Sequence, residues 1–339
     1  MIEMVHLNIS PLLISVLTGR SLGEIPTFPT ISDLPGNYGQ LVAKNIKKVP
    51  SAFPSNIQSL ICENCGKMAR VDLGHVTINI QKYKRDQTED MDKHIQSTGY
   101  FRCHHCNSAG KWEITNEYRM MAISALLTFN SPLAEDRFTF GKNMLFDGSS
   151  HKYATDAEEY LLNKIMKSKD APYLWNRLGN LYYKGGRPDL AVCAFEHSIS
   201  LDPLQTESLF SLGMILSDID PEESANQYHR MLVSAGKYTR MDALNLRNLL
   251  SNGLSDLLFF YSISNGEISM IPPLSLYQEL QIETSNSEES TFNIIEGEVD
   301  SDDLESFYPI AEIFMGKQSE ALPRKKVYFA KKKKKRKKR

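Results

Sequence analysis

Residues 171–203 constrain the fold more than any other part of the chain. They read APYLWNRLGNLYYKGGRPDLAVCAFEHSISLDP. In the first half of this stretch, apolar residues recur every three or four positions, which is the spacing of one buried face of an α-helix. Gly185 and Gly186 favour a turn, and Pro188 fits the first position of a second amphipathic helix. The stretch therefore predicts two helices joined by a tight turn and packed on each other.

The same stretch resembles the tetratricopeptide repeat, a helix–turn–helix unit of about 34 residues. The family's characteristic positions are occupied by Trp175, Leu178, Gly179, Tyr182, Ala191, Phe195 and Pro203. A degenerate copy follows 34 residues later, with Leu212 and Gly213 at the positions of Leu178 and Gly179. The resemblance implies a stack of helix pairs over residues 153–253, and Gly253 fits the end of the last helix.

Stacked repeats of this family form a curved solenoid whose first helices line a concave face for a partner peptide. Projected onto this chain, the resemblance implies a groove lined by Tyr173, Asn176, Asn180, Tyr183, Lys184 and Phe210. Asn176 and Asn180 would bind a peptide backbone, although solvated polar residues on an exposed helix face have the same pattern. The family's clamp for a terminal carboxylate needs several groove cations, and Lys184 alone is found, so that activity is not expected. A groove this short would equally serve to pack the β domain.

Two Cys-x-x-Cys pairs are the second informative feature. Cys62 and Cys65 lie in CENCGK, and Cys103 and Cys106 lie in CHHCNSAG. Two such turns supply four thiolates in a tetrahedron, which is the closed geometry of a structural Zn²⁺ site. Because that geometry leaves no open position for water or substrate, the pattern favours a structural zinc ion over a catalytic one.

The cysteine pattern resembles a zinc ribbon, whose knuckles lie at the tips of β-hairpins. Gly66 and Asn107 follow the two pairs and suit the positive-φ position that completes such a turn. Alternating apolar residues between and after the pairs predict the strands. The 37 residues that separate the pairs exceed the common spacing of about 15–20, which predicts an extended hairpin or arm. His104 or His105 would be an alternative ligand, but exposed turn residues are the simpler interpretation.

The chain of 339 residues has a formal net charge of −2, but its charges are segregated. Between Arg247 and Lys317 there are 13 acidic residues and no Lys or Arg, whereas 13 basic residues and one acid follow from Lys317 on. The acidic, Ser-rich part predicts poor order. The last nine residues are all cationic and are candidate phosphate contacts: Lys331, Lys332, Lys333, Lys334, Lys335, Arg336, Lys337, Lys338 and Arg339.

This basic tail calls for an anionic partner. Nucleic acid is one candidate, because each phosphate contact releases counterions and gives salt-sensitive binding without sequence preference. The alternatives are the chain's own acidic stretch, nuclear import, an acidic membrane surface, or a solubilising tail without a specific partner. No stretch of about 18 apolar residues occurs in the sequence, so we expect no membrane span.

These features predict an α+β multidomain fold, in which a small zinc-ribbon-like β domain precedes an α-helical solenoid and a disordered, charged C-terminal region. The expected segments are 1–60 without a clear pattern, 61–130 zinc-ribbon-like, 131–152 a linker, 153–253 repeat-like, 254–322 acidic and partly disordered, and 323–339 polybasic.

The sequence contains no glycine loop for nucleotides, nucleophile elbow or open metal motif. An enzyme would need a site built jointly by residues 1–60 and the ribbon, so we expect a non-catalytic protein. The leading hypothesis is a scaffold or adaptor that binds a protein partner in its repeat groove. The alternative is a nucleic-acid- or ribosome-associated factor that uses the ribbon and the basic tail. The paired cysteines fit a reducing compartment, which predicts a cytoplasmic protein, or a nuclear one if the source has a nucleus.

Overall fold

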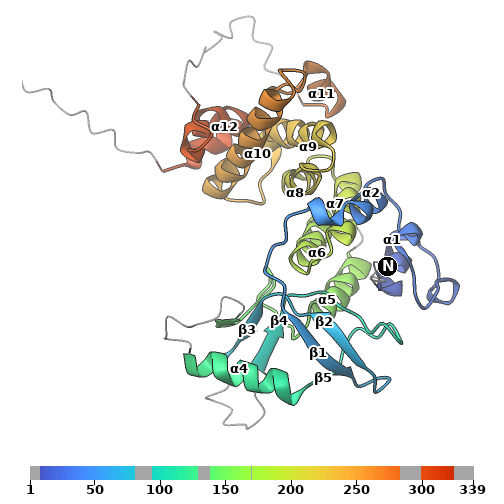
Figure 1. Ribbon diagram of the computed structural model, residues 1–339. Coiled ribbons are helices and arrows are strands. Elements are labelled where there is room, and N and C mark those ends of the chain that lie inside the picture. The colour runs from blue at the N-terminus through green and yellow to red at the C-terminus, as the bar shows by residue number, and fades with distance from the viewer. Residues whose placement is uncertain (1–7, 81–93, 129–137, 169, 283–298, 324–339) are drawn as a thin grey trace, which may run out of the picture.

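The computed structural model has a mixed α+β architecture, with two small sheets followed by helices. In Figure 1 the sheets lie at one end, the helices of residues 154–234 fill the middle, and those of residues 243–321 lie at the other end. The structure describes residues 8–80, 94–128, 138–168, 170–282 and 299–323. The candidate phosphate contacts at 331–339 lie outside the described residues.

The first sheet carries the first cysteine pair. Strand β1 (Ile57–Cys62) pairs antiparallel with β2 (Met68–Asp72) on one side and with β5 (Trp112–Ile114) on the other. Cys62 ends β1 and lies opposite Trp112 in the register. Because of this pairing, the residues that follow the second cysteine pair lie beside the tip of the β1–β2 hairpin.

The second sheet has the order β4–β3–β6. Its strands are β3 (Val76–Ile78), β4 (Ile95–Ser97) and β6 (Phe138–Phe140), with β3 antiparallel to β4 and parallel to β6. Strand β6 falls within the segment expected to be a linker, and it joins the sheet because Phe138 is buried there. Helix α4 (Asn116–Thr128) lies beside the two sheets in Figure 1.

The stretch that predicted two packed helices forms them, and further helices flank it. These are α5 (Ala154–Lys167), α6 (Pro172–Lys184), α7 (Pro188–Leu201), α8 (Thr206–Leu216) and α9 (Pro221–Ser234). Helix α6 packs on α7, and α8 packs on α9. A Cβ added at Gly179 would lie 2.4 Å from a ring carbon of Phe195, and one added at Gly213 would lie 2.8 Å from the Tyr228 ring. Glycine thus allows both helix pairs to approach closely.

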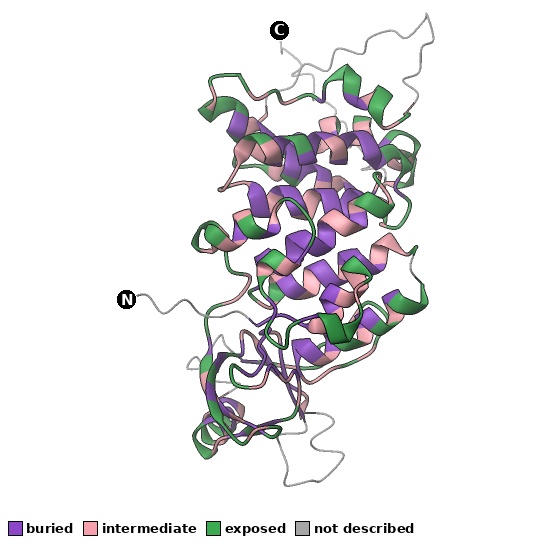
Figure 2. Cartoon of the chain, turned by 90° about the vertical axis from the view of Figure 1, so that its right-hand side faces the viewer, coloured by how far each residue is buried: buried purple, intermediate pink, exposed green. Residues whose placement is uncertain are grey.

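The expected helix end at Gly253 is wrong, because helix α10 (Ala243–Ile263) continues past that residue. Gly253 lies inside the helix, where a Cβ would be only 2.6 Å from the Met231 side chain. The glycine therefore permits close packing against α9 and does not terminate α10. Figure 2 shows buried residues running through the stacked helices.

The structure contains helices in the segment expected to be acidic and partly disordered. Helices α11 (Leu274–Glu279) and α12 (Tyr308–Met315) follow α10, and α12 packs on α10. Phe307, Ala311 and Met315 are fully buried against α10, and their spacing of four residues places them on one helical face. Burial of this apolar face explains why residues 299–323 are ordered despite the surrounding acids.

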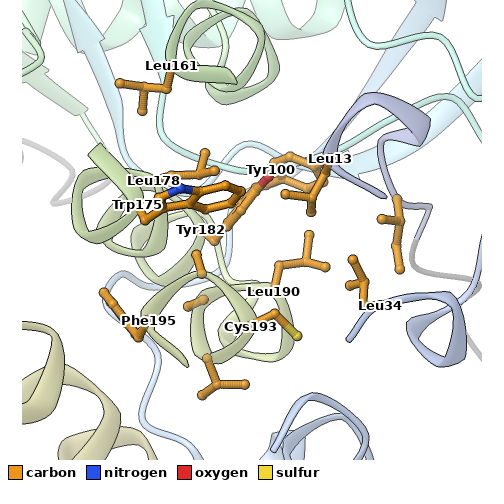
Figure 3. Close-up of a cluster of buried hydrophobic side chains, with 14 of the residues drawn as sticks. Leu13, Leu34, Tyr100, Leu161, Trp175, Leu178, Tyr182, Leu190, Cys193 and Phe195 are labelled. Atoms are coloured by element: carbon orange, nitrogen blue, oxygen red, sulfur yellow. The ribbon is translucent and has the colours of Figure 1, made fainter. Parts of the chain in front are cut away.

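The N-terminal segment packs on the helices as well. It contains α1 (Pro11–Thr18) and α2 (Gly39–Lys44), which lie against α5 and α7 respectively. Figure 3 shows Leu13 beside Tyr100 and Leu34 near Cys193, all within one apolar core. Short 3₁₀ turns complete the structure at Leu22–Glu24, Ile31–Asp33, Ile46–Lys48, Ala235–Lys237, Leu304–Phe307 and Gly316–Ala321.

Candidate metal centre

All four predicted cysteine ligands gather at one point. Their Sγ atoms lie within 4.8 Å of one another, with Cys62 3.8 Å from Cys106 and Cys65 3.6 Å from Cys103. Four sulfurs about 2.3 Å from a tetrahedral Zn²⁺ would be about 3.8 Å apart. The observed spacing therefore fits a four-thiolate metal site. Within the described ranges, this is the one group of three or more His, Cys, Asp or Glu side chains placed to hold a metal ion.

The two knuckles share one backbone geometry. The carbonyl of Cys62 accepts a hydrogen bond from the Gly66 amide at 2.7 Å, and that of Cys103 accepts one from the Asn107 amide at 2.8 Å. In each knuckle the amide of the first cysteine also donates to a carbonyl five residues later, at 3.0 Å. Gly66 and Asn107 have φ values of 68° and 54°, as the turn chemistry predicts.

The pKa values of three of these thiols are shifted in different directions. Burial raises the pKa of Cys103 to about 12 and also raises that of Cys62. Burial raises the pKa of Cys106 too, but hydrogen bonds from the Asn64 side chain, the Ser108 amide and the neighbouring cysteine thiols together outweigh it and lower that pKa to about 7. Metals bind the thiolate form, so binding at Cys62 and Cys103 must displace protons.

The donor set consists of sulfur alone. His104 and His105, inside the second knuckle, are exposed and do not belong to the cluster. Soft thiolate ligands suit Zn²⁺ and other thiophilic metals better than Mg²⁺ or Ca²⁺. The residues present thus fit a structural metal ion and offer no ligand position to a substrate.

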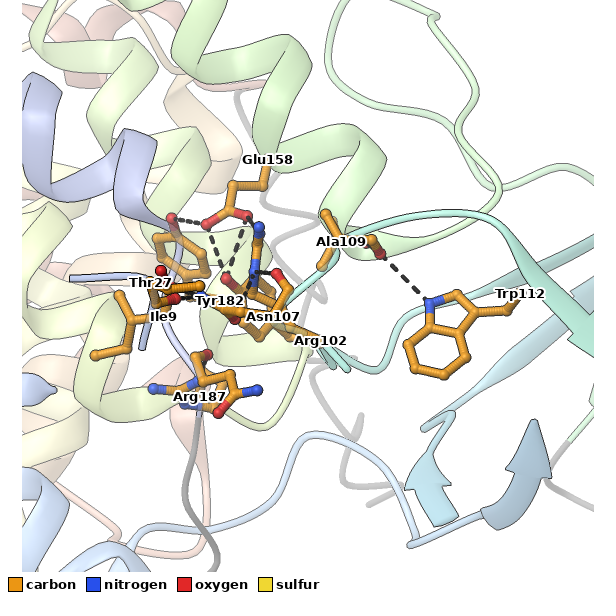
Figure 4. Close-up of polar contacts among 12 residues, drawn as sticks. Ile9, Thr27, Arg102, Asn107, Ala109, Trp112, Glu158, Tyr182 and Arg187 are labelled. Atoms are coloured by element: carbon orange, nitrogen blue, oxygen red, sulfur yellow. Dashed lines mark hydrogen bonds and ion pairs between the residues drawn. The ribbon is translucent and has the colours of Figure 1, made fainter. Parts of the chain in front are cut away.

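The second knuckle is tied to the N-terminal segment by buried hydrogen bonds, which Figure 4 shows in part. The side-chain amide of Asn107 donates to the carbonyls of Ile9 (3.0 Å) and Thr27 (2.6 Å). Asn8 donates from its side chain to the Cys103 carbonyl at 2.7 Å. The residue that completes the knuckle turn therefore also positions a segment about 80 to 98 residues away in sequence.

A buried ion pair extends this network to the helices. Arg102 donates through Nε to the Asn107 carbonyl (3.1 Å) and through Nη1 to Glu158 of α5 (3.1 Å). The hydroxyls of Tyr100 (3.0 Å) and Tyr182 (2.7 Å) donate to the same Glu158 carboxylate. Burial raises the pKa of Glu158, and the Arg102 guanidinium opposes that shift. The four-cysteine cluster is thus connected to α5 and α6 through a buried, hydrogen-bonded ion pair.

A second buried ion pair, Arg187 with Asp189, also contacts the N-terminal segment. Arg187 donates twice to Asp189, at 2.9 and 2.7 Å, and once to the Asn8 carbonyl at 3.0 Å. Neither Arg102, Glu158 nor this pair was expected from the sequence. In the sequence, Asn107 stood out only as a residue that tolerates a positive φ. That preference gave no indication of which residues its side chain would contact.

The predicted groove residues occupy different environments. Asn176 is buried, with its side-chain amide 3.0 Å from the Ser208 hydroxyl. The Tyr183 hydroxyl donates to the Pro50 carbonyl at 3.1 Å. The half-buried Phe210 ring lies 5.9 Å from the Tyr228 ring.

Asn180 and Lys184 of α6 line one cavity, and Lys184 is exposed. Tyr173, on the same helix, contacts Phe146 of that cavity, with ring centroids 6.0 Å apart. Three of the predicted groove residues therefore meet around the cavity. The other three take part in helix packing or contact neighbouring segments.

The fold and site define an α+β protein in which a cluster of four cysteines, placed to hold a metal ion, is joined to a helical region. Comparison of the chain with family models, curated proteins and solved structures finds no match. Among the residues that the structure describes, no helix has the length and apolar character that crossing a membrane would require.

Proposed function

We propose that this chain is a non-catalytic scaffold or adaptor, whose tetratricopeptide-like helix pairs bind another protein and whose four cysteines hold a structural Zn²⁺. The proposal rests mainly on one face of helix α6. Asn180 and Lys184 lie on it beside a cavity, and Tyr173 extends it towards Phe146.

The packing of the helix pairs supports the repeat assignment. Gly179 lies against Phe195 and Gly213 against Tyr228, so in both pairs a glycine of the first helix contacts an aromatic ring of the second. The two rings are 33 residues apart, one fewer than a repeat, because His229 holds the position equivalent to Phe195. The two glycines are 34 residues apart, which equals the length of the tetratricopeptide unit. A glycine that recurs at the repeat length and contacts an aromatic ring of the following helix supports assigning these helix pairs to one repeated unit.

The polar network supports a structural role for the metal. Four thiolates would complete the coordination of Zn²⁺, so its contribution is to hold the two knuckles together. Cys103 and Asn107 in turn anchor the N-terminal segment through their backbone and side-chain hydrogen bonds. Zinc would therefore stabilise the scaffold that supports α6.

Site-specific photo-crosslinking tests the protein-binding proposal. A photoreactive amino acid is placed at Asn180 in the full chain, and at Lys44, an exposed residue of α2 outside the cavity, as the control. After nuclease treatment, we expect a defined polypeptide adduct from position 180 and not from position 44, and the purified polypeptide should bind the chain directly. The same adducts from both positions, or none from position 180, would refute the proposal.

The nine consecutive cations at the end of the sequence support a second function, binding to nucleic acid. A salt series with RNA and duplex DNA would compare the full chain with a truncation ending at Ala330. We expect the full chain alone to bind, with an affinity that falls steeply with salt, if the tail contacts phosphates. Absence of binding at physiological salt would eliminate this second function.

A further inference from the structure

A cavity of about 230 Å³ lies between α6 and residues 143–154. Leu181 and Ala154 contribute to its apolar wall, and Ala154 is the first residue of α5. Pockets for cofactors and drug-sized ligands usually measure about 300–1,000 Å³. This cavity is smaller, so its size suits one anchoring side chain of a larger partner.

Two buried polar atoms on the lining residues have no hydrogen-bond partner within the described structure. Ser97 is 5% exposed, and its Oγ is unpaired. Arg177 donates through Nη1 to Glu207 at 2.9 Å, but its Nε is buried and unpaired. Buried polar groups are nearly always hydrogen-bonded. Arg177 Nε can only donate, so its unpaired N–H makes this wall more favourable for an acceptor, such as a carboxylate oxygen, than for a donor.

The charges around the cavity favour an anion. Lys184 is exposed at the rim, and Arg240 lies over the Tyr173 ring at 4.5 Å from its centroid. The nearby Lys164 and Arg177 are each paired with one carboxylate. The N-terminus of α5, where Ala154 lines the cavity, adds the positive end of a helix dipole.

An exposed aromatic ring adds an apolar surface beside these charges. Phe146 is 46% exposed, lines the cavity and stands edge-on to Tyr173. An aromatic wall next to a few hydrogen-bond donors suits an amphipathic ligand. A polyanion such as RNA would call for several unpaired cations, and Lys184 is the one cavity-lining cation without an ion pair among the described contacts.

We propose that this cavity binds an acidic segment of a partner protein. A glutamate or aspartate side chain enters it and pairs with Lys184, while a neighbouring apolar residue packs on Phe146. The inference rests on the proposed protein-binding function and names the chemistry of the partner at the same face of α6.

Fluorescence polarisation with the full chain tests the inference. The probe is a blocked, fluorescein-labelled heptapeptide with glutamates flanking one phenylalanine, and its analogues carry glutamine or lysine at the glutamate positions. We expect the acidic peptide to bind about tenfold more tightly than the glutamine peptide, the effect of about one charged hydrogen bond. Lys184→Glu should reverse the preference towards the lysine peptide, and Phe146→Ala should weaken all binding. Lys44→Glu, an exposed lysine outside the cavity, should change nothing.

Equal affinities for the acidic and glutamine peptides, or acidic-peptide binding that survives Lys184→Glu, would overturn the inference. Tighter competition by oligouridylate or inorganic phosphate than by unlabelled acidic peptide would assign the cavity to phosphate and overturn it too. If the polypeptide crosslinked at Asn180 still binds the Lys184→Glu variant, the protein-binding function stands and the acidic-segment inference fails. If position 180 crosslinks no polypeptide, it is the protein-binding function that fails.

Discussion

Arg102 and Glu158 form an ion pair across 3.1 Å, with side chains 7% and 0% exposed, between the second cysteine knuckle and α5. The same arginine contacts Asn107, which completes the knuckle and binds the N-terminal segment. Metal centre, N-terminal segment and helices therefore share one buried network. We expect them to unfold as one cooperative unit and not as separate domains.

Arg102→Met leaves the Glu158 carboxylate buried without its cation. Breaking one side of a buried pair costs about 3–5 kcal/mol, so urea denaturation should show a loss of that order. Arg230→Met is the matched control, because its partner Glu279 is 59% exposed and such pairs contribute less than about 1 kcal/mol. Equal losses in the two variants would contradict the proposed role of the network.

Cys106→Ser removes one sulfur from the metal site. Metal analysis of the purified chain should find one Zn²⁺ per wild-type molecule and a markedly lower content in the variant. Cys193→Ser is the matched control, because Cys193 is buried against Gly39 of the N-terminal segment and lies outside the cluster. Unchanged zinc content in Cys106→Ser would contradict four-sulfur coordination.

Gly179→Ala places a methyl group against the Phe195 ring, at 2.4 Å from its nearest carbon. Overpacking of this kind costs about 1–3 kcal/mol, which thermal unfolding should report as a lower midpoint. Gly23→Ala should have little effect, because nothing lies within 4 Å of the added carbon. Combining Gly179→Ala with Phe195→Leu should recover part of the lost stability, because the smaller side chain leaves room for the added methyl group. An unchanged unfolding midpoint in Gly179→Ala would show that the close contact between the helices does not require glycine.

Stability should fall as the pH drops below the ordinary histidine pKa of 6.5. His229 is 8% exposed, its Nε2 donates to the Ser269 carbonyl at 2.8 Å, and burial lowers its pKa. The unfolded chain therefore takes up this proton at higher pH than the folded chain, so protonation favours unfolding. His229→Gln should show a smaller loss of unfolding free energy between about pH 7.5 and about pH 5. Parallel pH profiles for the two proteins would exclude His229 as a contributor.

Features set by local spacing could be predicted from the sequence. Each cysteine turn is formed by residues no more than five apart, so Gly66 and Asn107 mark its geometry directly. The helices on either side of Pro188 follow equally from apolar periodicity and turn residues. No neighbour elsewhere in the chain was needed for these predictions.

Features set by distant partners could not be predicted. Arg102 and Glu158 are 56 residues apart, and charged side chains are seldom fully buried, so neither stood out. Gly253 fits either a helix end or a close contact, and only the position of Met231 decides between them. The helices of the N-terminal segment are 6 and 8 residues long and owe their stability to packing, which leaves little local signal.

Hydrogen exchange with and without a zinc chelator tests most directly whether the metal centre and the helices are one unit. We predict that chelation removes amide protection from both knuckles, and also from α5 and residues 8–27, because Asn107 and Arg102 lose their fixed positions. Loss of protection confined to β1, β2, β5 and the knuckles, with α5 and residues 8–27 unchanged, would contradict the account.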